Sequence, residues 1–105
     1  MTETAQLTPS NGVELDSMGY SVSISNDVAL AGAPGVIGYT LRQAVYAFLK
    51  PASGWKTTVQ TAAVSQPSTY AQFGFSVSNI GSTIVVGAPG SAYTNYQGLV
   101  YVYGP

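Results

Sequence analysis

The sequence predicts an all-β fold made of two copies of one unit, and three observations support this. Shifting the chain against itself by 55 positions aligns three blocks without a gap. Apolar and polar residues alternate in short runs, the period-2 pattern of strands. Turn-forming residues separate these runs, and no segment keeps helical spacing over three turns. The aligned blocks are Gly19-Tyr-Ser-Val-Ser23 with Gly74-Phe-Ser-Val-Ser78, Gly32-Ala-Pro-Gly35 with Gly87-Ala-Pro-Gly90, and Val45-Tyr46 with Val100-Tyr101.

The first inner strand of each unit follows from alternation. In the first unit the apolar residues Tyr20, Val22 and Ile24 alternate with serines, which predicts a half-buried strand with the serines on its polar side. Asn26-Asp27 comes next and predicts a two-residue hairpin turn, because both residue types tolerate positive φ. Gly81-Ser82 stands at the same place in the second unit.

The remaining strands are bounded by Gly and Pro. Apolar strands are predicted over 28–31 and 83–86, each ended by Gly-Ala-Pro-Gly, because proline cannot donate to a strand ladder. Third strands are predicted over 44–48 and 99–103. A fourth strand is predicted within 55–63, and its counterpart at the start of the chain is 4–8.

A repeat near 50 residues is the size of one β-propeller blade. We therefore predict two four-stranded antiparallel propeller blades, the first unit spanning 1–55 and the second 56–105. The chain begins with an outer strand that has no blade of its own and ends with a blade that lacks one. We expect closure between copies, with a homotrimer of six blades preferred and a homotetramer of eight next, or closure within a longer parent chain. The strands predicted to pair across copies are Thr4, Ala5, Gln6, Leu7 and Thr8 with Leu99, Val100, Tyr101, Val102 and Tyr103.

The two motif sets Met18-Gly19…Gly32-Ala33-Pro34 and Phe73-Gly74…Gly87-Ala88-Pro89 resemble FG-GAP repeats, as do the Val-Tyr blocks of the third strands and the position of Trp55. This resemblance implies a propeller like those of integrin α-chains, fungal lectins and bacterial exported proteins. It also implies an extracellular or cell-surface setting and a role in recognition or adhesion. Many members carry an Asp-rich calcium loop between the first two strands, but the connection here is only 25–27 and 80–82. Calcium needs about six to eight oxygen ligands, so we expect no metal site.

Composition excludes several classes of function. Charged residues make up 7% of the chain, the net charge is −1, and the chain has no histidine and no cysteine. We therefore expect no nucleic-acid binding, no membrane insertion, no zinc site, no cofactor and no enzyme activity. The acidic pair Glu14 and Asp16 could be read as a metal or glycosidase-like pair, but solvated turn residues are the favoured interpretation. No signal peptide is visible at the start of the sequence.

The candidate ligand-binding residues are aromatic and amide side chains between the second and third strands. They are Tyr39, Tyr93, Asn95 and Tyr96. An aromatic platform beside hydrogen-bonding groups is what a sugar site needs, although ordinary loop packing also accounts for them. Two functions stay open: a recognition or adhesion module that binds glycan or protein, and a purely structural blade pair whose activity is self-assembly.

Overall fold

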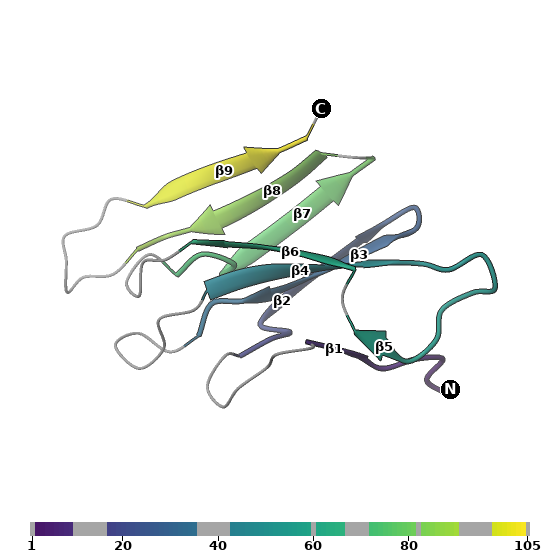
Figure 1. Ribbon diagram of the computed structural model, residues 1–105. Helices are drawn as coiled ribbons and strands as arrows, with labels where there is room; N and C mark the ends of the chain where they lie inside the picture. The colour runs from purple at the N-terminus through teal and green to yellow at the C-terminus, as the bar shows by residue number, and fades with distance from the viewer. Residues whose placement is uncertain are drawn as a thin grey trace.

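A computed structural model describes residues 2–9, 17–35, 43–59, 61–66, 72–81, 83–90 and 98–104. Within these ranges the fold is all-β and contains no helix, as predicted (Figure 1). The strands form one two-stranded, one four-stranded and one three-stranded sheet. Their bounds are β1 Leu7–Thr8, β2 Ser21–Ser25, β3 Val28–Ala33, β4 Gln43–Leu49, β5 Thr58–Val59, β6 Ala62–Gln66, β7 Ser76–Ile80, β8 Thr83–Ala88 and β9 Leu99–Tyr103.

The first blade is the four-stranded antiparallel sheet, in the order β2-β3-β4-β6. Asn26 adopts φ 54° in the β2–β3 turn, as its residue type predicts. Strand β3 runs two residues past its predicted end, because Gly32 and Ala33 still pair with β4 and the ladder stops only at Pro34. The fourth strand, β6, begins at the end of the stretch predicted for it, since residues 58–59 of that stretch form β5 instead.

The second blade repeats the first blade but, among the described residues, lacks its fourth strand. Its order is β7-β8-β9, so β9 is an edge strand of its sheet among the described residues. The β8–β9 register repeats the β3–β4 register at the offset of 55, with Val86 opposite Tyr101 as Ala31 is opposite Tyr46. The structure therefore contains a four-stranded blade followed by a three-stranded one, as the strand order predicts.

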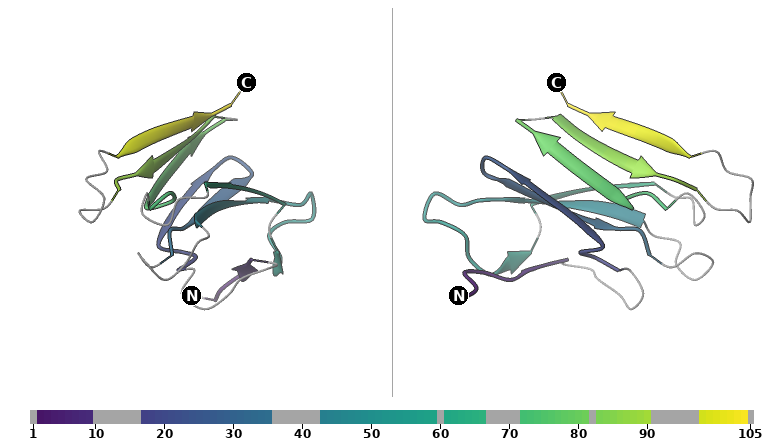
Figure 2. Two further views of the ribbon diagram at one scale, coloured as in Figure 1. Left: turned by 60° about the vertical axis from the view of Figure 1, so that its left-hand side comes forward. Right: turned by 180° about the vertical axis from the view of Figure 1, so that it is seen from behind.

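The N-terminal strand β1 lies beside the first blade, at the opposite end of the molecule from β9 (Figures 1 and 2). It pairs in parallel with β5, Leu7 opposite Thr58 and Thr8 opposite Val59. Within one chain, then, the two predicted closure strands do not meet.

The two blades stack through β2 and β7, which run side by side (Figure 2). One hydrophobic cluster fills the space between the blades, and a second covers the other face of the first blade. The first cluster contains Leu30, Val45, Phe73, Val86 and Ala88; the second contains Ala31, Ala33, Ala44, Tyr46 and Phe48. The second cluster is in turn contacted by the partly buried side chains of Leu7, Met18 and Trp55.

The burial of β2 is the reverse of what its alternation predicts. Its serines are half-buried, whereas Val22 and Ile24 are 70% and 63% exposed. The serines point toward the second blade, and the apolar side of the strand points away from it. The alternation correctly identifies the two sides of the strand, but the second blade covers the polar one.

Candidate functional site: a covered blade face and its uncovered counterpart

The turn that begins the second blade inserts into the first blade. The Ser21 hydroxyl donates a hydrogen bond to the carbonyl oxygen of Gly74 at 2.9 Å. The backbone N–H of Phe73 donates to Oε1 of Gln43 at 3.2 Å, in a buried position. Gly74 has φ +94°, and a Cβ added there would lie 2.8 Å from the backbone oxygen of Ala44. Only glycine allows this close backbone approach.

Phe73 is the apolar anchor of this turn. Its side chain is 0% exposed and packs with Leu30 and Val45 of the first blade. Within its own blade it makes edge-to-face contacts with Tyr101 and Tyr103, with ring centroids 5.2 and 6.4 Å apart. Aromatic pairs of this geometry add to the stabilisation from burial. The turn is therefore held by one buried ring and two hydrogen bonds.

Polar contacts along the inner strands complete the blade interface. The Ser23 hydroxyl donates to Oδ1 of Asn79 at 2.6 Å and accepts from its backbone N–H at 3.3 Å. The Asn79 amide then donates to the carbonyl oxygen of Val28 at 3.3 Å. These bonds satisfy polar groups that the stacking of β2 on β7 removes from water, which explains why serines face the second blade.

We call the side of the first blade that touches the second its back face; it carries Leu30, Val45 and Ala47. The back face of the second blade is the equivalent surface, 55 positions later: Val85, Val100 and Val102. Leu30 and Val45 are each 1% exposed, whereas Val85 and Val100 are 36% and 68% exposed. The same apolar surface is thus covered in one blade and open in the next. Exposed apolar patches of this kind mark interaction sites.

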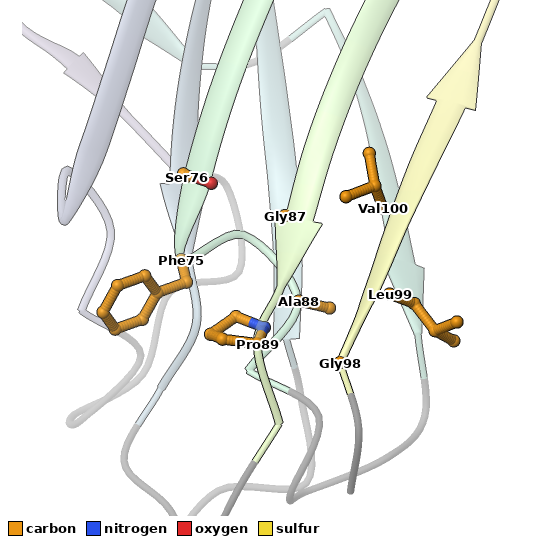
Figure 3. A pocket seen from close by; sticks show the side chains of 8 residues that line it. All are labelled: Phe75, Ser76, Gly87, Ala88, Pro89, Gly98, Leu99 and Val100. Carbon is orange, nitrogen blue, oxygen red and sulfur yellow. The ribbon is translucent and has the colours of Figure 1, made fainter.

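A hollow of about 620 Å³ lies at one end of the second blade's back face (Figure 3). Gly87 and Gly98 leave the backbone of its floor bare between the side chains of Phe75 and Val100. Of the lining residues that the structure describes, none is charged, and Ser76 alone has a polar side chain. The lining residues are Phe75, Ser76, Gly87, Ala88, Pro89, Gly98, Leu99 and Val100.

The opposite surface of the molecule is also apolar. We call it the front face of the first blade; it carries Val22 and Ile24 on β2 and the second hydrophobic cluster on β3 and β4. Val22 corresponds to Val77, which packs into the core between the blades. The second blade contacts the first blade through its own front face. The front face of the first blade is the equivalent surface, 55 positions earlier in the sequence.

The residues predicted to bind a ligand, Tyr39, Tyr93, Asn95 and Tyr96, lie outside the described residues, as do Glu14 and Asp16. Of the closure residues, β9 has the predicted bounds 99–103, whereas only Leu7 and Thr8 of the N-terminal stretch are in a strand. In the described ranges, His, Cys, Asp and Glu nowhere gather in a group of three that could hold a metal. No helix in the same ranges is long and apolar enough to cross a membrane.

Sequence reasoning missed the interface roles of Ser21, Gln43 and Asn79. Ser21 recurs as Ser76, so the repeat carried a signal for it. Gln43 and Asn79 align with Gly98 and Ile24, so no repeated residue pointed to them.

No curated protein matches the chain. The family model of the FG-GAP repeat matches twice, over residues 1–48 and 57–103. FG-GAP repeats build β-propeller-type modules and are typically non-enzymatic and extracellular. The first matched stretch holds β1 to β3 and nearly all of β4, the second holds β5 to β9, and together they cover most of the sequence. The chain therefore belongs to the FG-GAP repeat family and carries two repeats in tandem.

Proposed function

We propose that this chain is a self-assembling pair of propeller blades, whose copies join head to tail into a closed ring that serves recognition or adhesion. One observation carries the proposal: β6 completes the first blade, the second blade has three strands, and the sequence equivalent of β6 is the N-terminal segment. An exposed sheet edge is a template for another strand. The N-terminal strand of a second copy has the right sequence position to occupy it.

The register of this pairing follows from the first blade. Strand β6 pairs with β4 so that Ala63 lies opposite Tyr46 and Ala62 opposite Ala47. Moving each pair by 55 positions places Thr8 opposite Tyr101 and Leu7 opposite Val102. The segment from Thr8 to Ser21 equals in length that from Ala63 to Ser76. A copy whose strand completes one blade can therefore place its own first blade next in line, as the chain does internally.

The assembly that this geometry supports is a ring. Each copy offers the edge of β9 at one end and β1 at the other, so every contact is head to tail, and such contacts form rings when the rotation closes. Propellers have about four to eight blades. Two blades per chain then give a homotrimer of six blades as the preferred assembly and a homotetramer of eight as the next.

Cysteine cross-linking tests the register directly, because the chain has no cysteine of its own. In the variant Leu7→Cys/Val102→Cys, oxidation should produce covalent oligomers that end at the size of the ring. Facing residues on antiparallel strands lie within the Cα separation of about 4.4–6.8 Å that a disulfide allows. The two sites lie on opposite sides of one chain, so the cross-link must join copies.

Two variants serve as controls that share Leu7→Cys. Leu7→Cys/Thr58→Cys should cross-link within one chain and stay monomeric, since these residues are paired in β1 and β5. Leu7→Cys/Leu99→Cys is three residues out of register and should cross-link far less than the Val102 variant. Cross-linking that ignores register, or light scattering that gives one chain mass at every concentration of the wild type, would refute the proposal.

We assign recognition to the loops that hold Tyr39, Tyr93, Asn95 and Tyr96, with glycan or protein as the ligand and an extracellular or cell-surface setting. The residue types support this assignment, since aromatic faces beside amide groups suit sugars. Tyr93→Ala and Tyr96→Ala should abolish saturable signals on a glycan array while the assembled mass is unchanged. An array without signals from the wild type would favour the purely structural blade pair.

A further inference from the structure

We propose that the hollow on the second blade receives the Met18–Gly19 turn of a second copy. This inference rests on the proposed function, because a head-to-tail ring is what brings the two surfaces together. It adds a residue-level contact on the face of the blade, separate from the pairing of β1 with β9 at its edge. Within one chain the equivalent contact already exists: the Phe73–Gly74 turn fills the equivalent site on the first blade.

The receiving site is largely the same in both blades. Ser76, Gly87 and Ala88 stand where Ser21, Gly32 and Ala33 stand in the first blade. In the first blade, Ser21 and the backbone at Gly32 and Ala33 contact Gly74. In the second blade, the same three residue types line an open hollow. A Cβ placed on Gly32 would collide with the backbone of Gly74, whereas one placed on Gly87 meets only Ser76. By this comparison, the turn of the second copy would lie next to Gly87.

The incoming turn is already in the docking conformation. Gly19 and Gly74 both have φ +94°, and the residues two positions earlier, Ser17 and Gln72, have φ 61° and 59°. Gly19 donates to the carbonyl of Gly32 at 3.0 Å, as Gly74 donates to that of Gly87 at 3.2 Å. A Cβ added to Gly19 would meet nothing within 4 Å, so the side of the turn that docks is open. Binding therefore needs little rearrangement of the turn, which lowers its entropic cost.

The expected contacts follow by analogy with the filled site. The Ser76 hydroxyl would donate to the carbonyl oxygen of Gly19, as Ser21 does to Gly74. Met18 would lie against Val85 and Val100, as Phe73 lies against Leu30 and Val45. Gly98 stands where Gln43 stands in the first blade, so this position offers no side-chain amide to the N–H of Met18. The flexible thioether of methionine suits a site whose shape differs in this way.

The chemistry of the hollow favours a second copy over a small ligand. Its described lining is mostly apolar, with the Ser76 hydroxyl as the polar side chain among those residues and no charged side chain in that set. Small-molecule sites enclose the ligand and orient it with several polar groups. An apolar face with bare backbone at its centre instead fits a glycine turn of complementary shape, which is what the first blade binds at this position.

The variant Gly87→Ala tests the inference. In the isolated chain the atom nearest to the new methyl is the Ser76 hydroxyl oxygen, which can rotate away, and the nearest backbone atom among its three closest neighbours is 3.9 Å off, an ordinary contact, so the monomer should keep its fold. In the assembly the methyl would meet the backbone of Gly19 in the partner, which cannot move aside. We expect association of the variant to be weaker by about 10- to 100-fold, measured by sedimentation over a concentration series. The far-UV spectrum and the thermal midpoint of the dilute protein report on the fold.

Two further variants separate docking from local strain. Ser76→Ala/Gly87→Ala removes the internal contact but leaves the methyl in place. Since it also removes the hydroxyl proposed to bind Gly19, its association should be at least as weak as that of Gly87→Ala. Val100→Ser removes an exposed valine at the rim of the hollow and should weaken association by about tenfold if Met18 packs there. Leu49→Ser changes an exposed residue at the end of β4 that neither proposed contact includes, so it serves as the control and should not change association.

The outcomes distinguish this inference from the proposed function. If the wild type assembles and both Gly87→Ala and Val100→Ser assemble equally well, the turn does not dock in the hollow, and the edge pairing alone holds the ring. Recovery of association in Ser76→Ala/Gly87→Ala would likewise overturn the inference, because it would assign the loss to local strain. If the wild type never assembles, the proposed function and this inference fall together.

Discussion

The stacking of the two blades can be tested by two glycine substitutions that share a backbone conformation but differ in what the new methyl group contacts. Gly19→Ala and Gly74→Ala both place alanine at φ +94°, which costs each about 1–2 kcal/mol of stability. At Gly19 the methyl enters open space. At Gly74 it lies 2.8 Å from the backbone oxygen of Ala44 and 3.2 Å from the backbone nitrogen of Ala33. Neither atom belongs to a flexible side chain, so we expect a further loss of about 1–3 kcal/mol for Gly74→Ala alone.

Urea unfolding of the two variants measures this difference. The experiment is run at a protein concentration low enough that the wild type is monomeric, so that association does not contribute to stability. With a denaturant slope of about 1.5 kcal/mol/M, the unfolding midpoint of Gly74→Ala should lie about 0.7–2 M below that of Gly19→Ala. The slopes of the two variants should agree. Equal midpoints would show that the Gly74 turn does not pack against the first blade, and the inferences built on that contact would lose their basis.

Two further changes probe the same turn. Gln43→Ala should lower the free energy of unfolding by about 1–3 kcal/mol, because it leaves the buried N–H of Phe73 without the Gln43 amide oxygen. Thermal unfolding measures this loss, and an unchanged midpoint would contradict the prediction. Phe73→Ala should lower the free energy of unfolding by about 3–5 kcal/mol in the same assay, since the ring is fully buried. Met18→Ala changes the equivalent residue of the first unit, which is half-buried, and should destabilise the monomer clearly less. A similar loss for both would mean that the two turns are equally buried within a single chain.

The sequence predicts the strands of this fold because each is short, alternating and closed by a turn. Strand β9 has the predicted bounds, and the Asn26 turn has the predicted positive φ. The end of β3 was placed too early, because proline stops the ladder at its own position and not before it. The fourth strand begins later than expected, because residues 58–59 pair with β1 in a parallel arrangement that no local pattern announces.

The candidate interaction surface could be predicted only in part. From the sequence alone, the repeat identifies β1 as an outer strand without a blade of its own. It also identifies β9 as the third strand of a blade that has no outer strand. Alternation shows that Ser23 and Val22 occupy opposite sides of β2, but it does not say which side the next blade covers. Here Ser23 meets Asn79 across the interface, and Val22 is left exposed. That choice depends on a contact between residues 56 positions apart, which a local pattern does not contain.

The N-terminal strand pairs with β5 within the chain, and the proposed ring would give it a second partner in another copy. Within one chain β1 forms two register pairs with β5, whereas β6 forms five with β4, and the β1–β9 pairing is its equivalent. In the proposed ring, exchange between copies would replace the β1–β5 pairs by pairs along the edge of β9 and would cover the apolar back face of the second blade. Against this stands the translational freedom that each association removes. A closed ring of three chains has three such interfaces but needs only two associations. Closure thus adds one interface without a further loss of that freedom, which favours rings over open chains of the same copies.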